Sequence, residues 1–165
     1  MDNEATCARP GRDRWFLLVL LAFALPLPVL VLTDAALTWD GAYYLFHMLH
    51  TRTPFIAHDR LIDAPLHWPV VLAQHLTDDL PTLRAVFGSL HAVTPLAAIA
   101  LSWWVVRGAA PALIIWPVLT IGIATLPGQI NLISEGIKAQ QLFWPVLLAI
   151  LVRLPPRTIP LAAML

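Results

Sequence analysis

Charged residues are scarce in this sequence. They make up 12% of its 165 residues, whereas soluble domains carry about 25%. The ten basic residues equal the ten acidic residues in number, so the formal net charge is zero. A disordered chain needs low hydrophobicity with high net charge, and a nucleic-acid-binding protein needs an excess of positive charge. The composition excludes both classes, and no nucleic-acid partner is expected.

Cysteine is almost absent as well. The single cysteine, Cys7, has no intramolecular partner and precedes the first apolar run, so we expect a free thiol. The sequence also has no glycine-rich phosphate loop and no internal repeat. Hydrophobicity is therefore the main signal: 59% of the residues are hydrophobic, and the mean hydropathy is +0.75.

Four runs without charged residues account for most of this hydrophobicity, at 15–33, 85–106, 108–134 and 139–152. A helix needs roughly 20 apolar residues to cross about 30 Å of hydrocarbon. The runs therefore predict an all-α integral membrane protein with transmembrane helices at about 15–33, 85–106, 109–128 and 137–153. A segment 1–14 precedes this single domain (15–154), and a short tail (155–165) follows it.

Two of these runs need comment. The first is longer than the apolar core of a signal peptide and lacks a small-residue cleavage site after it, so we expect it to remain as a span. The fourth is short. It crosses the bilayer only if its helix starts near Glu135 and the Lys138 side chain extends back to the headgroups. Prolines inside the runs, such as Pro26 and Pro117, predict bends.

Basic residues predict the orientation, because they gather on the cytoplasmic side of short loops. With the N-terminus in the cytoplasm, six of the ten lie inside, namely Arg9, Arg12, Arg14, Arg107, Arg153 and Arg157. Three of the other four lie in the long loop 34–84, where the rule has little force. The prediction is a multi-pass protein of the bacterial inner membrane, with the lipid bilayer as its environment.

The outer loop 34–84 is too long to be a turn. Within it, 42–50 and 65–76 carry apolar residues at helical spacing and predict two short amphipathic helices lying in the outer interface. The loop also contains five of the six histidines. His47 and His50 share a helical face, but the rest are scattered, so no metal site and no cofactor are predicted, although a divalent metal in this loop stays open.

Asp40 is the strongest catalytic candidate in the outer loop. A carboxylate near the outer bilayer surface can serve as a general base or can anchor an acceptor. Gly41 permits close approach of a ligand, and Tyr43 and Tyr44 can stack on a sugar or lie among the headgroups. An equally simple alternative makes Asp40 the N-cap of the helix that follows.

The layout and the motif Trp39-Asp40-Gly41-Ala42-Tyr43-Tyr44 resemble the N-terminal module of the GT-C superfamily of glycosyltransferases. The resemblance implies that Asp40 acts at the sugar-acceptor site and that the donor is a polyprenyl-phosphate-linked sugar. It also implies that basic groups of the loop, among them His58, Arg60 or Arg84, meet the donor phosphates. GT-C enzymes have eight or more spans, so the chain matches a truncated module, and whether it is an active enzyme stays open.

A second polar group lies between the third and fourth runs. Glu135, a weaker catalytic candidate, and Lys138 lie three residues apart and can form an ion pair on one helical face. With Gln141, they could instead face the same cleft as Asp40 and bind substrate. His91, inside the second run, is a further candidate because ionisable residues within spans are rare.

The sequence therefore favours a GT-C-like protein that binds a lipid-linked sugar or a lipid headgroup at the outer face. The alternative is a non-catalytic subunit that scaffolds a larger complex with a membrane protein partner.

Overall fold

The computed structural model describes residues 10–56, 61–125 and 135–153, apart from the side chains of 10–13 and 135. Within these ranges every regular element is a helix. The all-α prediction is therefore confirmed.

Seven α-helices of very different length make up the described chain: α1 (Pro10–Ala24), α2 (Leu27–Leu32), α3 (Asp40–Thr51), α4 (Ala64–Ala73), α5 (Leu80–Val106), α6 (Ile115–Leu119) and α8 (Glu135–Arg153). Shorter helical pieces join them: the 3-10 helices η1 (Ala35–Leu37), η3 (Leu61–Asp63) and η4 (Pro111–Ile114), and the π-helix η5 (Thr120–Thr125).

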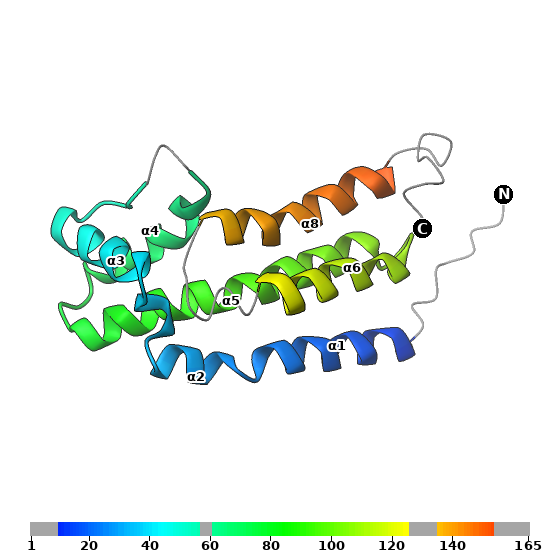
Figure 1. Ribbon diagram of the computed structural model, residues 1–165, viewed down its shortest axis with the longest axis horizontal. Helices are drawn as coiled ribbons and strands as arrows, with labels where there is room; N and C mark the ends of the chain where they lie inside the picture. The colour runs from blue at the N-terminus through cyan, green and yellow to red at the C-terminus, as the bar shows by residue number, and fades with distance from the viewer. Residues whose placement is uncertain (1–9, 57–60, 126–134, 154–165) are drawn as a thin grey trace.

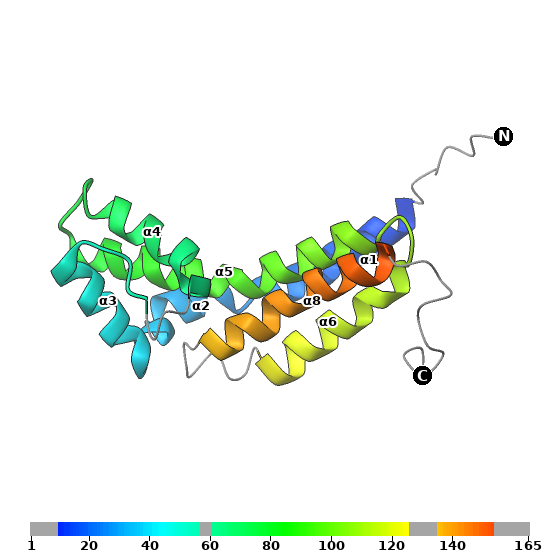
Figure 2. The ribbon, with the colours of Figure 1, turned by 90° about the horizontal axis from the view of Figure 1, so that it is seen from above.

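Four helical rods extend along one common axis, and a pair of short helices closes one end (Figures 1 and 2). The first rod consists of α1 and α2, the second of α5, the third of η4, α6 and η5, and the fourth of α8. Helices α3 and α4, with η1 and η3, form what we name the cap. Helix α5 is central, because it contacts α1, α2, α4, α6 and α8. The described ends of the chain, at α1 and α8, lie away from the cap.

Local sequence signals explain where α5 begins. The Asp79 carboxylate accepts hydrogen bonds from the Thr82 hydroxyl and, over 2.9 Å, from the Thr82 backbone N–H. Asp79 is thus an N-cap, and these bonds lower the pKa of its carboxyl. The 27 residues of α5 give a rod of about 40 Å, at 1.5 Å per residue.

Proline and glycine shape the other rods. The first rod breaks between α1 and α2 at Pro26, as a missing backbone donor predicts. The third changes from 3-10 to α to π geometry within Pro111–Thr125. A Cβ at Gly122 would lie 3.1 Å from the Phe23 ring, so glycine permits α1 and η5 to approach closely here.

Two apolar cores hold these parts together. The cap core comprises Ala36, Tyr44, Leu45, Met48, Val70 and Phe87. The rod core comprises Ala98, Ile99 and Ile121, with partly buried neighbours such as Phe23 and Leu142. The burial of Leu45 and Met48 agrees with the helical face predicted for 42–50. In α4, Val70 is buried, whereas Trp68 and Leu72 are 53% and 59% exposed.

The structure bears out only part of the four-span prediction. Two helical segments are long and apolar enough to cross a membrane, Arg14–Leu32 and Leu80–Val106. They correspond to the first two predicted spans. The third run is a shorter apolar segment, Pro111–Thr125, and the fourth corresponds to α8, which begins with Glu135 and Lys138. That any of the four crosses a membrane stays a prediction. Two short helices, α3 and α4, lie where the sequence predicted helices at 42–50 and 65–76; their position in a membrane interface stays a prediction.

Candidate functional site

Asp40 lies at a strained turn on the surface of the cap. It is the first residue of α3, and the N-cap position belongs to Trp39, which has φ 52° and ψ −122°. The Gly41 N–H donates to the Thr38 carbonyl over 3.2 Å. These values describe a type II′ turn with Trp39 at the position that glycine ordinarily occupies. A tryptophan there costs roughly 1–3 kcal/mol, and the exposed Asp40 follows directly.

The two tyrosines after Asp40 have different environments. Tyr43 is 56% exposed, whereas Tyr44 is 6% exposed. The Tyr44 ring packs in the cap core, with its centroid 4.9 Å from that of Phe55 and 6.1 Å from that of His67. Tyr43 is therefore the tyrosine whose ring a sugar could reach from solvent, whereas Tyr44 packs α3 against the cap core.

Arg84 is already engaged within the chain. Its guanidinium forms a two-pronged ion pair with the Asp34 carboxylate, and one bond, from Nε to Oδ1, measures 3.2 Å. Asp34 follows α2 in a left-handed conformation, with φ 53°, which aspartate tolerates better than most residues. The pair ties the end of α2 to the start of α5. An anion at Arg84 would have to share it with Asp34.

A second ion pair is deeply buried. Lys138, the only lysine of the sequence, donates from α8 to the Asp63 carboxylate of η3, and their side chains are 4% and 3% exposed. This bond joins the cap to α8 across 75 residues of sequence. Gln141, three residues further along α8, has no exposed surface.

Two histidines complete what we name the buried polar cluster: Asp63, His67, His91, Lys138 and Gln141. His67 of α4 hydrogen-bonds through Nδ1 to the Phe55 carbonyl over 2.7 Å. Its ring centroid lies 6.1 Å from that of His91, and His91 lies within electrostatic range of Lys138 and His67. Because buried charges are costly unless paired and hydrogen-bonded, this cluster makes the join between cap and rods specific.

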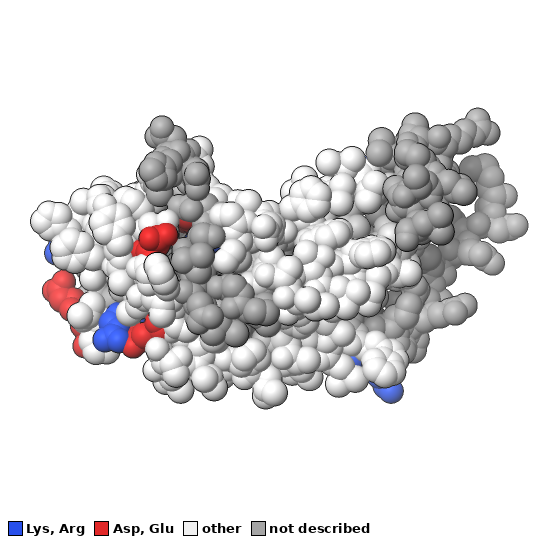
Figure 3. All heavy atoms as spheres, in the orientation of Figure 1, with Lys and Arg blue, Asp and Glu red and all other residues white. Residues whose placement is uncertain are grey.

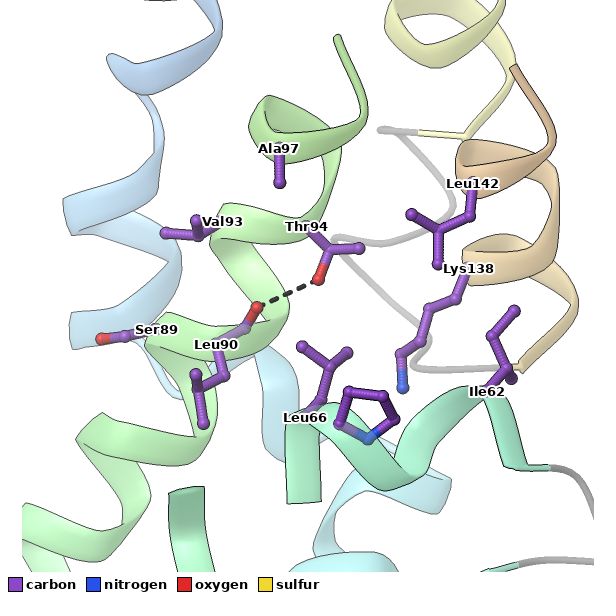
Figure 4. Close-up of a pocket in the computed structure, with 10 residues that line it drawn as sticks. Ile62, Leu66, Ser89, Leu90, Val93, Thr94, Ala97, Lys138 and Leu142 are labelled. Carbon is purple, nitrogen blue, oxygen red and sulfur yellow. Dashed lines mark hydrogen bonds between the residues drawn. The ribbon is translucent and has the colours of Figure 1, made fainter. Parts of the chain in front are cut away.

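An apolar cavity of about 400 Å³ lies beside the Lys138 side chain (Figure 4). It is lined by α4, α5 and α8, mainly with hydrocarbon from residues such as Leu66, Val93 and Leu142. The Thr94 hydroxyl donates back to the Leu90 carbonyl over 3.0 Å, which satisfies this polar group within α5. Pockets for small molecules measure about 300–1,000 Å³, so the cavity has room for part of an apolar chain.

The predicted site residues that the structure describes therefore lie in four places. Asp40 and Tyr43 lie on the exposed face of α3, Tyr44 in the cap core, Arg84 in its ion pair with Asp34, and Lys138 and Gln141 in the buried polar cluster. The predicted partner of Lys138 was Glu135, but Asp63 pairs with it. The Glu135 side chain, His58 and Arg60 lie outside what the structure describes, so their roles stay predictions.

Sequence reasoning did not single out Asp63 or His67. One signal could have found Asp63: among the loop carboxylates it stands between Ile62 and Ala64 within an apolar stretch, where a charge needs a partner. Lys138, beside an apolar run, has the same need. His67 has no comparable signal, because it is one of several scattered histidines.

No group of three or more metal-ligating side chains gathers anywhere in the described ranges. Comparison of the chain with models of protein families, with curated proteins and with solved structures finds no match. Any function must therefore be inferred from the residues of this chain alone.

The buried ion pair predicts strongly non-additive mutations. Removing one partner, by Lys138→Met or by Asp63→Leu, should lower the free energy of unfolding by about 3–5 kcal/mol, because the other charge stays buried. The double variant should recover most of this loss, because both charges are gone. Denaturant unfolding of the purified protein measures all three. A double variant as unstable as the sum of the single ones would contradict the pairing, and Asp78→Asn, at an exposed site, serves as the neutral control.

The strained turn predicts a stabilising substitution. Trp39→Gly should raise the free energy of unfolding by about 1 kcal/mol, because glycine adopts positive φ without strain. Trp39→Ala is the matched control: it removes the same ring but keeps a Cβ, so it should bring no such gain. Thermal unfolding of both variants tests this, and an equal effect of the two would show that the ring, and not the backbone, matters.

Proposed function

We propose that this chain is a multi-pass membrane protein in which α1–α2, α5, Pro111–Thr125 and α8 are four spans. The rods share one axis (Figures 1 and 2). The 19 residues of α8 and the 27 residues of α5 extend for about 28 Å and about 40 Å, and the hydrocarbon layer is about 30 Å thick. Among the described side chains visible on the face in Figure 3, charged ones lie toward the cap and near the opposite end, and none lies on the white surface between them. This distribution suits a hydrocarbon layer around the rods.

The charges at the two ends support one orientation. In the described part of the chain, the charged side chains at the end away from the cap are Arg14, Arg107 and Arg153. The described carboxylates, Asp34, Asp40, Asp63, Asp78 and Asp79, all lie in the cap or in the segments that join it to α2 and α5. Because short cytoplasmic segments are rich in arginine and lysine, we place the cap outside, on the outer face of the bacterial inner membrane.

At this outer face, we propose that the chain binds a polyprenyl-phosphate-linked sugar in the manner of the GT-C glycosyltransferases it resembles. The observation that carries this proposal is the exposed Asp40 at the strained Trp39 turn, because backbone strain gathers at functional sites. Tyr43, one turn further on the same helix, supplies an exposed ring for a sugar. The cavity beside Lys138 supplies an apolar surface for the first units of the lipid chain.

The proposed chemistry is a sugar transfer with inversion. The acceptor hydroxyl oxygen attacks the anomeric carbon, the bond from that carbon to the phosphate oxygen breaks, and the polyprenyl phosphate leaves with the electron pair. Asp40 takes the proton of the acceptor hydroxyl as general base, or anchors the acceptor by a hydrogen bond. Arg84 could meet the phosphate in part, since it is 37% exposed although paired with Asp34.

One observation favours the alternative of a non-catalytic subunit. None of the most apolar window of Arg14–Leu32 is buried in this chain. A neighbouring membrane protein could cover that face, as lipid could. Co-purification of one stoichiometric membrane partner, without transferase activity in either protein, would favour this alternative.

For the transferase, Asp40→Asn should lower the rate of sugar transfer from a polyprenyl-phosphate sugar by about 10²–10⁴-fold, because the amide cannot accept the proton. The assay uses membrane vesicles with equal amounts of each protein. Asp78→Asn is the matched control, since it also removes an exposed carboxylate, in the turn between α4 and α5. Full activity of the Asp40 variant would exclude its role as base.

The four-span topology predicts the sides on which reporters appear. Fusions after Arg107 and after Arg153 should report cytoplasm, and a reporter inserted at Thr77, in the turn between α4 and α5, should report the outer side. Paired alkaline phosphatase and fluorescent-protein fusions measure this. An outer-side signal after Arg153 would mean that α8 does not cross.

A further inference from the structure

A groove runs between α5 and α8 at the end of the molecule opposite the cap. Its volume is about 510 Å³, and it is separate from the cavity beside Lys138, although Leu142 borders both. Helices α5 and α8 run side by side in the same direction (Figures 1 and 2). Their carboxyl ends therefore meet at one end of the groove.

The lining of the groove changes along its length. Leu101 and Val105 of α5 and Val146 and Ile150 of α8 present hydrocarbon, and Arg153 lies at the terminal end. Trp104, which is 67% exposed, also lines the groove. A long apolar groove that ends in an arginine and a tryptophan matches the profile of a lipid from acyl chain to headgroup.

We infer that this groove binds an anionic glycerophospholipid of the inner leaflet, with one acyl chain along α5 and α8 and its phosphate at Arg153. Charge complementarity selects this occupant. The described charged side chains at this end are all arginines, Arg14, Arg107 and Arg153, and no ion pair of Arg153 occurs within the described part of the chain. The guanidinium at the last turn of α8 can donate two parallel hydrogen bonds to one phosphate.

The inference rests on the proposed membrane placement but needs no sugar transfer. It assigns a lipid to the inner end, whereas the proposed reaction lies at the outer end. A chain that passes the topology test and fails to bind lipid would lose this inference and keep the proposed function.

The test is native mass spectrometry of the purified full chain in detergent, titrated with phosphatidylglycerol or phosphatidylcholine. The wild-type protein should bind phosphatidylglycerol more tightly. Arg153→Gln should weaken that binding about fivefold, the effect of one basic residue on an anionic lipid, and should leave phosphatidylcholine binding unchanged. Arg107→Gln is the matched control: it removes an exposed arginine at the same end that does not line the groove, so phosphatidylglycerol binding should persist.

A second pair of variants tests the groove itself. Ala149→Phe fills it and should reduce the binding of both lipids, whereas Ile123→Phe, at an exposed site on η5, should not. Thermal unfolding confirms that both variants fold. Equal weakening by Arg107→Gln and Arg153→Gln, equal affinity of the wild-type protein for the two lipids, or normal binding by folded Ala149→Phe would each overturn the inference.

Discussion

The ion pair between Lys138 and Asp63 is the interaction on which the rest of this structure depends. The cap and α8 are far apart in the sequence, and this buried bond joins them. A buried pair adds little net stability over well-packed apolar residues, but breaking it is expensive. The pair therefore mainly makes the packing of α8 against the cap specific, because the Lys138 charge is neutralised in only one register of the helix. The cavity beside Lys138 owes its position to that register.

The pair also changes how the charge at the start of the short fourth run is stabilised. Its charge-free stretch has 14 residues, 139–152, or about 21 Å of helix, which falls short of the hydrocarbon thickness. The sequence suggested that Lys138 extends to the headgroups. Instead, the cap brings a carboxylate to the lysine. The Asp63 carboxylate thus neutralises Lys138 inside the protein, so the start of α8 does not need the headgroups to stabilise its charge.

Much of the fold follows from local signals, and less of the candidate site does. Charge-free runs and prolines predict the rods and the break at Pro26, and helical spacing predicts α3 and α4. Pairing of charges across the fold is different, because it depends on the tertiary arrangement. Asp34 with Arg84, and Asp63 with Lys138, each link residues at least 50 positions apart. The spacing of Glu135 and Lys138 suggested a local pair, but burial of Lys138 beside the cap favours Asp63. The strain at Trp39 could not be predicted from the sequence either. The turn that it forms ordinarily has glycine at this position, so a tryptophan gives no signal for that turn.

The strained turn and the buried pair have complementary consequences for the proposed site. Strain at Trp39 persists only if the surrounding structure fixes the backbone on both sides. On one side, Asp34 with Arg84 ties the end of α2 to α5. On the other, the packing of Tyr44 and Met48 fixes α3 on the cap core, and Asp63 with Lys138 fixes that core against α8. Asp40 is therefore an exposed carboxylate on a rigid support. In a flexible loop, Trp39 would relax to negative φ, and the Asp40 carboxylate would move with it. Rigid placement of the acid suits the proposed reaction between a water-soluble acceptor and a lipid-linked donor, because the two substrates arrive from different phases and must meet at a fixed point.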